Sequence, residues 1–289
     1  MSAILIDGRT VAKKWKDYAA QRAQRLIEKG VTPHLAVILV GENAASQVYV
    51  RNKENACIHA GIRSTIIRLP EVCTQDELEN AVLSLNKDES VHGILVQLPL
   101  PKGLDEARVL ALIDPDKDVD GFHPQSVGAL SIGQKGFVSC TPAGIIELLK
   151  RSGIKIDGKE CVVIGRSNIV GKPMAMLLLR ENGTVTVCHS HTAGLKEVTR
   201  RADILVAAIG KPEFITHEYV KEGAVVIDVG IHRLGTNENG KSILCGDVDY
   251  DDVYPHVSAI TPVPGGVGPM TIAMLMNNCV NSVEVNKAE

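Results

Sequence analysis

The chain contains 289 residues, of which 45% are hydrophobic and 22% are charged. At about 150 residues for a typical domain, this length predicts two domains, and the composition excludes a disordered tail or a miniprotein that depends on disulfides. Lys and Arg number 31 against 34 Asp and Glu, and the net charge of −3 gives no long-range field to hold a polyanion, so we expect no nucleic-acid partner.

Short apolar runs alternate with helix-length amphipathic segments along the chain, and Gly, Pro or Asp closes each run. This alternation is typical of βαβ units. In the first half it predicts strands over 35–40, 65–69 and 93–98, and helices over 10–29, 43–60 and 74–87. Because the strands are mainly apolar, we expect a parallel sheet with helices on both faces.

The predicted helix 43–60 carries an unusual lysine. At about 100° per residue, Lys53 falls in the middle of an arc of small and apolar side chains, opposite the solvent face. Such a lysine either extends its stem along the surface or lines a pocket. In a pocket, partial desolvation would disfavour the ammonium and let Lys53 donate and accept a proton near neutrality. Tyr49, one turn earlier, would offer a flat ring to a planar ligand.

Gln97 interrupts the apolar run 93–98. A buried amide must find a hydrogen-bond partner. That partner is either an ordinary group of the core or loop end, or it is a ligand or Lys53, and the sequence leaves both alternatives open.

Four aspartates alternate at positions 114, 116, 118 and 120. From Asp116 the pattern imitates the start of an EF-hand, but the twelfth position is Val127, which cannot supply the bidentate carboxylate. We therefore reject a calcium site. Asp120, directly before Gly121, is also compatible with a simple turn.

We place the connection between the domains in the Gly-rich, weakly periodic segment 121–136. Thr141 and Pro142 then begin a helix, because a Thr side chain can cap the first amides and Pro suits the first turn. In the second half, strands are predicted over 161–164, 185–188, 204–209 and 224–229. A C-terminal helix is predicted over 269–285, packing back on the first domain.

A glycine turn and a helix follow the strand 161–164, with Gly165 and Gly171 separated by five residues. This geometry aims free helix amides at a phosphate, although the spacing is not that of G-x-G-x-x-G, and an ordinary strand-to-helix turn is the alternative.

The next strand ends in 189–192, His-Ser-His-Thr, where NAD-binding domains carry a carboxylate for the ribose. The missing acid and the added cation Arg166 favour NADP over NAD. The two histidines lack a third ligand at a recognisable spacing, so we reject a metal site.

The segment 262–271 has three glycines before a helix. It lacks the Lys-Ser/Thr pair of a Walker A loop. We expect its backbone to approach a ligand closely.

The seven cysteines are scattered, without a C-x-x-C pair, which predicts reduced core thiols in a cytoplasmic protein. The N-terminus lacks a basic region followed by an apolar stretch, and no apolar run approaches the roughly 18 residues that span a bilayer. We expect a soluble protein without a membrane partner.

Eight segments of the sequence, in order, resemble the bifunctional methylenetetrahydrofolate dehydrogenase/cyclohydrolase family. They span nearly the whole chain and read VGENAASQVYVRNKENA, GILVQLPLP, DKDVDGFHP, CTPAGIIELL, VVIGRSNIVGKP, ADILVAAIGKP, GAVVIDVGI and TPVPGGVGPMT.

The resemblance implies two open parallel-sheet α/β domains with a cleft between them for the folate. A catalytic folate-binding domain over 1–122 would be completed by the C-terminal helix 269–289, and 123–268 would form a Rossmann-like NADP-binding domain. The implied reaction oxidises 5,10-methylenetetrahydrofolate to 5,10-methenyltetrahydrofolate with NADP. Water then opens this cation to 10-formyltetrahydrofolate. The resemblance also implies a homodimer.

The family's functional residues are carried over by motif. Lys53 is then the proton-transfer residue of the hydrolytic step, and Gln97 hydrogen-bonds to it. Tyr49 would stack on the folate, and Asp120 would bind the pterin edge. The cofactor contacts fall on Gly165, Arg166, Ser167, Ser190 and Ile231.

Three positions depart from the usual pattern. Asn55 stands where a second Lys is common, Ser126 where Asn commonly follows D-G-F, and Ser139 where Pro precedes Cys140. These departures bear on substrate contacts and relative rates. Two other functions are left open, namely a dehydrogenase without cyclohydrolase activity and a non-catalytic protein that binds nucleotide and folate.

Overall fold

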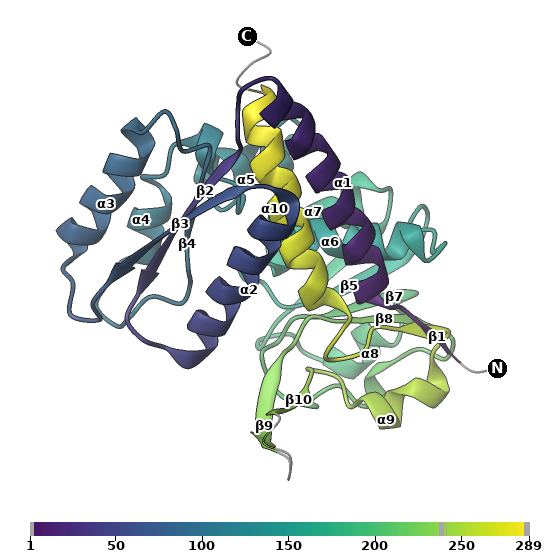
Figure 1. Cartoon of the computed structure of the whole chain (residues 1–289). Coiled ribbons are helices and arrows are strands. Elements are labelled where there is room, and N and C mark those ends of the chain that lie inside the picture. Colours follow the sequence, from purple (N-terminus) through teal and green to yellow (C-terminus); the bar gives the residue numbers. More distant parts are fainter. Residues whose placement is uncertain (1–2, 237–239, 241, 286–289) are drawn as a thin grey trace. The chain divides into compact units, whose positions relative to one another are not determined.

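The computed structural model describes residues 3–236, 240 and 242–285 (Figure 1). The chain divides into two compact units, the first drawn from 1–12 and 141–271 and the second from 13–140 and 272–289. Two helices, α1 (Gly8–Glu28) and α10 (Val267–Val285), contribute residues to both units. Within the described residues, no helix is long and apolar enough to cross a membrane.

The first unit contains a six-stranded sheet in the order β1-β11-β8-β7-β5-β6, and every neighbouring pair is parallel. Its strands are β1 (Ile4–Leu5), β5 (Glu160–Ile164), β6 (Thr184–Cys188), β7 (Ile204–Ala207), β8 (Val225–Asp228) and β11 (Ala259–Ile260). A separate antiparallel hairpin is formed by β9 (His232–Thr236) and β10 (Ser242–Cys245). The helices of this unit are α6 (Cys140–Arg151), α7 (Gly171–Arg180), α8 (Leu195–Thr199) and α9 (Tyr250–Val253). Cys140, the first residue of α6, belongs to the second unit.

The strand order reverses between β5 and β7. From β5 the chain crosses to β6 on one side and then returns to β7 on the other. In open α/β sheets, ligands bind beyond the carboxyl ends of the strands at such a switch point. The two loops that leave this point are 165–171 after β5 and 208–211 after β7.

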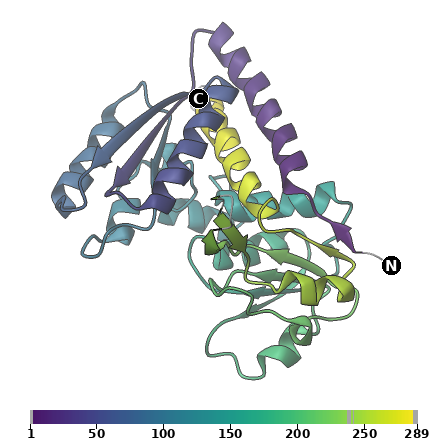
Figure 2. The same cartoon turned by 60° about the horizontal axis from the view of Figure 1, so that its bottom comes forward.

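The second unit contains a three-stranded parallel sheet in the order β3-β2-β4, with strands His34–Val40 (β2), Arg63–Leu69 (β3) and Gly93–Val96 (β4). The helix α2 (Ala44–Ala60) lies on one side of this sheet and α3 (Gln75–Lys87) on the other (Figures 1 and 2). Apolar side chains of α3, such as Leu78 and Val82, pack against the sheet residues Ile38 and Ile94. Shorter helices follow at α4 (Glu106–Leu110), η1 (Pro115–Lys117) and α5 (Pro124–Ser131).

Local signals set the ends of the long helices. A capping box formed by Thr74 and Glu77 begins α3, which satisfies two backbone amides that have no partner inside the helix. The helix α2 ends at Gly61, whose φ of 67° is a left-handed conformation that glycine adopts without strain.

The predicted helices 10–29, 43–60 and 74–87 are confirmed to within a few residues, and each predicted strand has a counterpart. The segment 121–136 contains α5, which its weak periodicity did not predict. Thr141 lies inside the first turn of α6, and its hydroxyl shares a 2.8 Å hydrogen bond with that of Thr271. The last four residues of the predicted C-terminal segment 269–289 lie outside the described residues.

Candidate functional site

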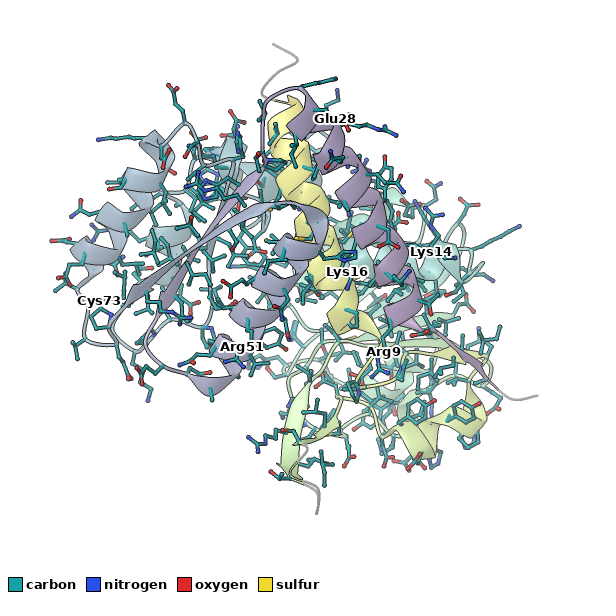
Figure 3. The ribbon with its side chains drawn as sticks, viewed as in Figure 1. Arg9, Lys14, Lys16, Glu28, Arg51 and Cys73 are labelled. Carbon is teal, nitrogen blue, oxygen red and sulfur yellow. The ribbon has the colours of Figure 1, made fainter. Side chains whose placement is uncertain are left out.

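One face of α2 is buried, and it carries Lys53. Asn43 begins the helix by accepting a 3.1 Å hydrogen bond from the Ser46 amide. The buried residues are Ser46, Val50, Lys53, Ala56, Cys57 and Ala60, whereas Arg51 on the other face is exposed (Figure 3). Lys53 is only 7% exposed, so its predicted place on the buried face is confirmed.

Lys53 binds Gln97 directly. The Nζ of Lys53 donates a 3.0 Å hydrogen bond to Oε1 of Gln97, and Nε2 of Gln97 donates to the Leu98 carbonyl at 2.7 Å. The backbone amide of Gln97 donates to the Ile38 carbonyl of β2. Both ends of the side-chain amide are therefore engaged, and the structure shows one partner from each alternative left open by the sequence, namely Lys53 and a backbone carbonyl at the end of the strand.

Asp120 lies within electrostatic reach of Lys53. Burial raises the pKa of Asp120, whereas the charge of Lys53 and a hydrogen bond with the Cys140 thiol act to lower it. The second unit thus brings together a cation, an amide and a carboxyl group from three separate segments of sequence.

Asp118, two residues earlier, holds the turn that follows Asp120. Its carboxylate is 1% exposed and accepts hydrogen bonds from the Phe122 amide (3.1 Å), the His123 amide (2.9 Å) and the Ser126 hydroxyl (2.7 Å). Burial raises the pKa of Asp118 to about 6, against the lowering effect of these donors. Sequence reasoning did not single out Asp118, because nothing in the alternating pattern distinguishes it from its neighbours.

Lys117 fixes the other flank of the same turn. Its Nζ donates to the carbonyls of Leu85, Asn86 and Asp88 at and just beyond the end of α3, where a helix leaves carbonyls without partners inside the helix. Lys117 and Asp118 therefore anchor the segment that contains Asp120, whose carboxyl group is close enough to Lys53 for the lysine charge to lower its pKa.

The remaining residues of the predicted folate site differ in accessibility. Tyr49 lies one turn before Lys53 and is 39% exposed, while burial of its hydroxyl raises its pKa, so the phenol stays neutral at physiological pH. Asn55 is exposed and Ser139 is buried. Ser126, the third departure, is the hydroxyl donor to Asp118.

The loop 165–171 forms a narrow cradle at the start of α7. Gly165 has a φ of 136°, and a Cβ on it would overlap the Ala208 carbonyl. A Cβ on Gly171 would overlap the Gly165 carbonyl in turn. Glycine is needed at both positions because the backbone segments lie against one another.

The Ser167 side chain pairs two backbone amides at the start of α7, which differs from the prediction for this loop. Its hydroxyl accepts hydrogen bonds from the Val170 and Gly171 amides, both at 3.2 Å. The sequence predicted free amides at the start of this helix for a phosphate, but the amides of Val170 and Gly171 are already paired. The sequence could not reveal this pairing, because the same Ser is compatible with a ligand contact.

Three predicted cofactor residues are exposed just beyond strand ends of the first unit. Arg166 follows β5, Ser190 follows β6, and Ile231, which is 47% exposed, follows β8. The His189 side chain stabilises this turn, because its Nδ1 accepts a 3.1 Å hydrogen bond from the His191 backbone amide. In the described part of the chain, no group of three or more His, Cys, Asp or Glu is arranged to hold a metal ion.

Of the three glycines in 262–271, Gly265 and Gly266 pack against protein, whereas a Cβ on Gly268 would meet open space. A Cβ on Gly8 would overlap the Gly266 carbonyl, and a Cβ on Gly265 would lie 2.9 Å from Nε of Arg9. Gly266 itself faces the Pro262 carbonyl. Gly265 and Gly266 therefore lie close to the start of α1 and to the loop itself, and the expected approach to a ligand stays a prediction.

Comparison with known proteins matches both units. Residues 6–120 match the family description "Tetrahydrofolate dehydrogenase/cyclohydrolase, catalytic domain", and 139–287 match "Tetrahydrofolate dehydrogenase/cyclohydrolase, NAD(P)-binding domain". Bifunctional protein FolD from Lachnoclostridium phytofermentans is 65% identical over 278 residues, which cover 96% of this chain and 97% of that protein. The FolD protein of Agathobacter rectalis is 61% identical over 282 residues, with 98% and 99% covered.

Solved structures agree over the full length. The FolD dehydrogenase/cyclohydrolase of Trypanosoma brucei, solved with NADP and an inhibitor, has a TM-score of 0.95 at 40% identity and covers 100% of both chains. The Campylobacter jejuni enzyme has a TM-score of 0.93 at 49% identity, covering 99% of this chain and 100% of that one. With two matching domain descriptions and full-length relatives well above 30% identity, the chain belongs to the tetrahydrofolate dehydrogenase/cyclohydrolase family.

Proposed function

We propose that this protein oxidises 5,10-methylenetetrahydrofolate to 5,10-methenyltetrahydrofolate with NADP and then hydrolyses the product to 10-formyltetrahydrofolate. Both domain types of the family are present in one chain, as in the bifunctional relatives. The observation that carries the hydrolytic half is the buried pair of Lys53 and Gln97, with Nζ and Oε1 3.0 Å apart.

In the hydrolytic step, Lys53 acts as the proton carrier. As the neutral amine it accepts a proton from the water that adds to the methenyl carbon, and as the ammonium it returns this proton to the ring nitrogen that leaves that carbon. The bond from the carbon to that nitrogen breaks as the formyl carbonyl forms, and the remaining hydroxyl proton leaves at this step, so the reaction consumes one water and releases one proton overall. Gln97 holds Nζ in place through its oxygen, since its own Nε2 is fixed on Leu98.

Two further side chains would orient the folate. Asp120 binds the polar edge of the pterin, and its closeness to Lys53 supports this role. Tyr49 stacks on the ring system from the preceding turn of α2, where it is partly exposed. We assign folate binding to 1–122 together with 269–289, and cofactor binding to 123–268.

The first unit fits NADP. Gly165 and Gly171 let the backbone segments of the turn after β5 pack closely at the switch point of the sheet, and the exposed cation Arg166 lies between them. Gly165, Arg166, Ser167, Ser190 and Ile231 would hold the cofactor, with Arg166 facing the 2′-phosphate. When bound, NADP supplies the nicotinamide that accepts the hydride.

We also propose that the protein acts as a cytoplasmic homodimer on small-molecule folates, without a nucleic-acid or membrane partner. The net charge of −3 supports the absence of a polyanionic partner. The seven cysteines are all free and buried, which is in keeping with a reducing compartment.

A coupled assay with Lys53→Met tests the function. The wild type should form NADPH from methylenetetrahydrofolate and NADP, and it should bleach the absorbance of the methenyl compound. Lys53→Met should lose methenyl hydrolysis by at least about a hundredfold, because general acid–base catalysis supplies about 10²–10⁴ in rate.

Lys14→Met, at an exposed position on α1 (Figure 3), is the matched control and should keep both activities. Methenyl hydrolysis by Lys53→Met at the wild-type rate would remove Lys53 from this role. Accumulation of the methenyl compound by the wild type would indicate a dehydrogenase alone, and NADP binding without turnover would indicate a non-catalytic protein.

A further inference from the structure

A buried carboxylate organises the loop that leaves the switch point of the six-stranded sheet. Asp247 is fully buried. Its Oδ2 accepts hydrogen bonds from the amides of Ile209 (2.6 Å) and Gly210 (3.1 Å), and its Oδ1 accepts from the Lys211 amide (3.0 Å). Three successive amides of one loop therefore converge on a single side chain.

The same carboxylate also binds the segment after β8. His232 Nε2 lies 2.8 Å from Oδ1 of Asp247, and His232 directly follows the predicted cofactor residue Ile231. A Cβ on Gly230 would overlap this carboxylate. Asp247 thus ties the loop after β7 to the loop after β8.

A second buried carboxylate fixes the backbone of Asp247. Asp228, at the end of β8, accepts hydrogen bonds from the amides of Asp247 (2.9 Å), Val248 (3.0 Å) and Gly230 (2.9 Å). Gly246 makes room for it, because a Cβ there would overlap Oδ2 of Asp228. Burial and the neighbouring Asp247 raise the pKa of Asp228 to about 6.

The loop held by Asp247 forms part of the cradle described above. Its first residue, Ala208, supplies the carbonyl that lies against Gly165, and its amide donates to the Ile164 carbonyl of β5. A shift of 208–211 would therefore alter the space beside Gly165, at the switch point where a dinucleotide is expected.

We propose that Asp247 is a positioning residue for the cofactor, which shapes the dinucleotide crevice by holding the loop 208–211 and, through His232, the segment after Ile231. This inference rests on the proposed binding of NADP. Asp247 itself is buried behind the loop amides, so its effect reaches the cofactor through the backbone.

Asp247→Asn tests the proposal with little change in volume. An Asn side chain has one acceptor oxygen where the carboxylate has two. Its NH2 group would therefore face at least one backbone N–H of 209–211 that has lost its hydrogen-bond acceptor. We expect NADPH to bind at least about tenfold more weakly, as measured by its fluorescence, because one lost charge-assisted hydrogen bond already corresponds to about that factor. The amides of 209–211 should exchange hydrogen faster, and the KM for NADP should rise more than kcat falls.

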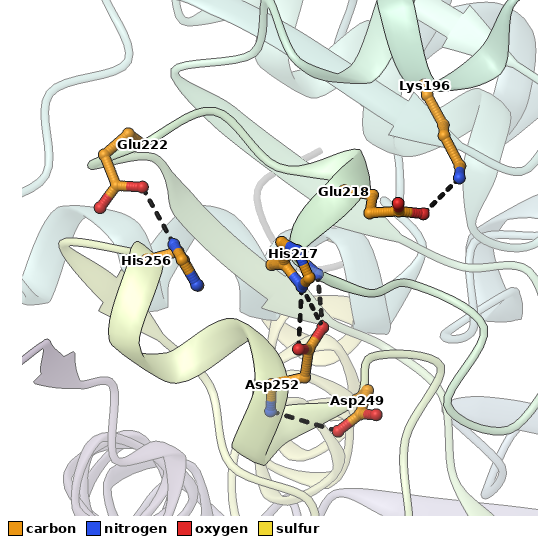
Figure 4. Close-up of polar contacts among 7 residues, drawn as sticks. All are labelled: Lys196, His217, Glu218, Glu222, Asp249, Asp252 and His256. Atoms are coloured by element: carbon orange, nitrogen blue, oxygen red, sulfur yellow. Dashed lines mark hydrogen bonds and ion pairs between the residues drawn. The ribbon is translucent and has the colours of Figure 1, made fainter.

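The second activity of the chain serves as an internal control. Hydrolysis of the methenyl compound without added NADP should be unchanged in Asp247→Asn, which shows that the variant is folded. Asp252→Asn is the matched control variant, because Asp252 forms another His–Asp pair of the same unit, with His217 Nδ1 at 2.8 Å (Figure 4). It should leave the affinity for NADPH unchanged.

The outcomes separate the two proposals. If the wild type does not bind NADPH, the proposed cofactor is wrong. If the wild type binds NADPH and Asp247→Asn binds it equally well, the positioning role is wrong.

Should Asp247→Asn lose hydrolysis as well, His232→Phe decides, since it removes one donor to Asp247 and leaves the three amides bound. This variant should hydrolyse normally and bind NADPH more weakly, and unchanged binding would overturn the proposal.

Discussion

The buried carboxyl group of Asp118 makes the stability of the turn after Asp120 depend on pH. Its pKa in the folded chain, about 6, lies above the ordinary value of 3.8. Between these two values the folded chain holds a proton that the unfolded chain has lost. The stability that Asp118 contributes is therefore fully present below about pH 4 and declines as the pH rises through about 6.

Asp118→Asn removes this dependence. We expect the free energy of unfolding of the wild type, relative to the variant, to fall by an amount on the order of 2 kcal/mol between pH 4 and pH 7.5, which corresponds to about two pKa units. Urea unfolding of both proteins at several pH values measures the difference. A difference that stays constant over this range would contradict the raised pKa.

Single residues could be predicted from the sequence where the pattern of one helix or one strand was enough to mark them as unusual. Lys53 was found because a single helix places it among small side chains, and Gln97 because it interrupts an apolar strand. Asp247 was not found, because its partners come from 209–211 and from His232. No periodic pattern connects these positions, and only the packed loops bring them together.

Among the elements, we propose that the loop 165–171 selects NADP over NAD. Arg166 is exposed directly after Gly165, and the turn after β6 contains no carboxylate for a ribose hydroxyl. A charge-assisted hydrogen bond to the 2′-phosphate contributes about 1.5–3 kcal/mol, and NAD lacks that phosphate.

Arg166→Ala should therefore weaken NADP by about ten- to a hundredfold and change NAD little. Steady-state KM values for the two cofactors measure this selectivity. Arg180→Ala, at an exposed position at the end of α7, is the control and should change neither value. Equal losses for NADP and NAD in Arg166→Ala would show that Arg166 does not read the phosphate.

The elements that the sequence predicted well are long and periodic, and those it missed are short. The helices α1, α2 and α3 have clear caps or apolar faces. By contrast, β1 and β11 have two residues each and form only because they pair with one another and with β8. Such strands depend on tertiary pairing, which no local pattern specifies.

For the whole molecule, α1 and α10 connect the stabilities of the two units. Each of these helices contributes residues to both units, so the loss of one unit leaves helical ends of the other unpacked. We expect a single unfolding transition in urea. NADPH at a hundred times its Kd should stabilise that transition by about 2.7 kcal/mol.

Unfolding followed by tryptophan fluorescence and by circular dichroism checks this expectation, since Trp15 lies in the second unit and circular dichroism reports both. Coincident curves that shift together with NADPH agree with it. Two separate transitions, of which NADPH moves only one, would show that the units unfold independently.

The pairing of β1 with β11 also has a consequence for synthesis on the ribosome. Ile4 emerges 255 residues before its partner Ala259. The strands β2, β3 and β4 find their neighbours within a short stretch of chain, whereas β1 has no partner until β11 has been made. A truncated nascent chain that stops before β11 therefore leaves the backbone of Ile4 and Leu5 without a strand to pair with, and because both side chains are exposed even in the folded chain, such an unpaired apolar strand favours aggregation and chaperone binding.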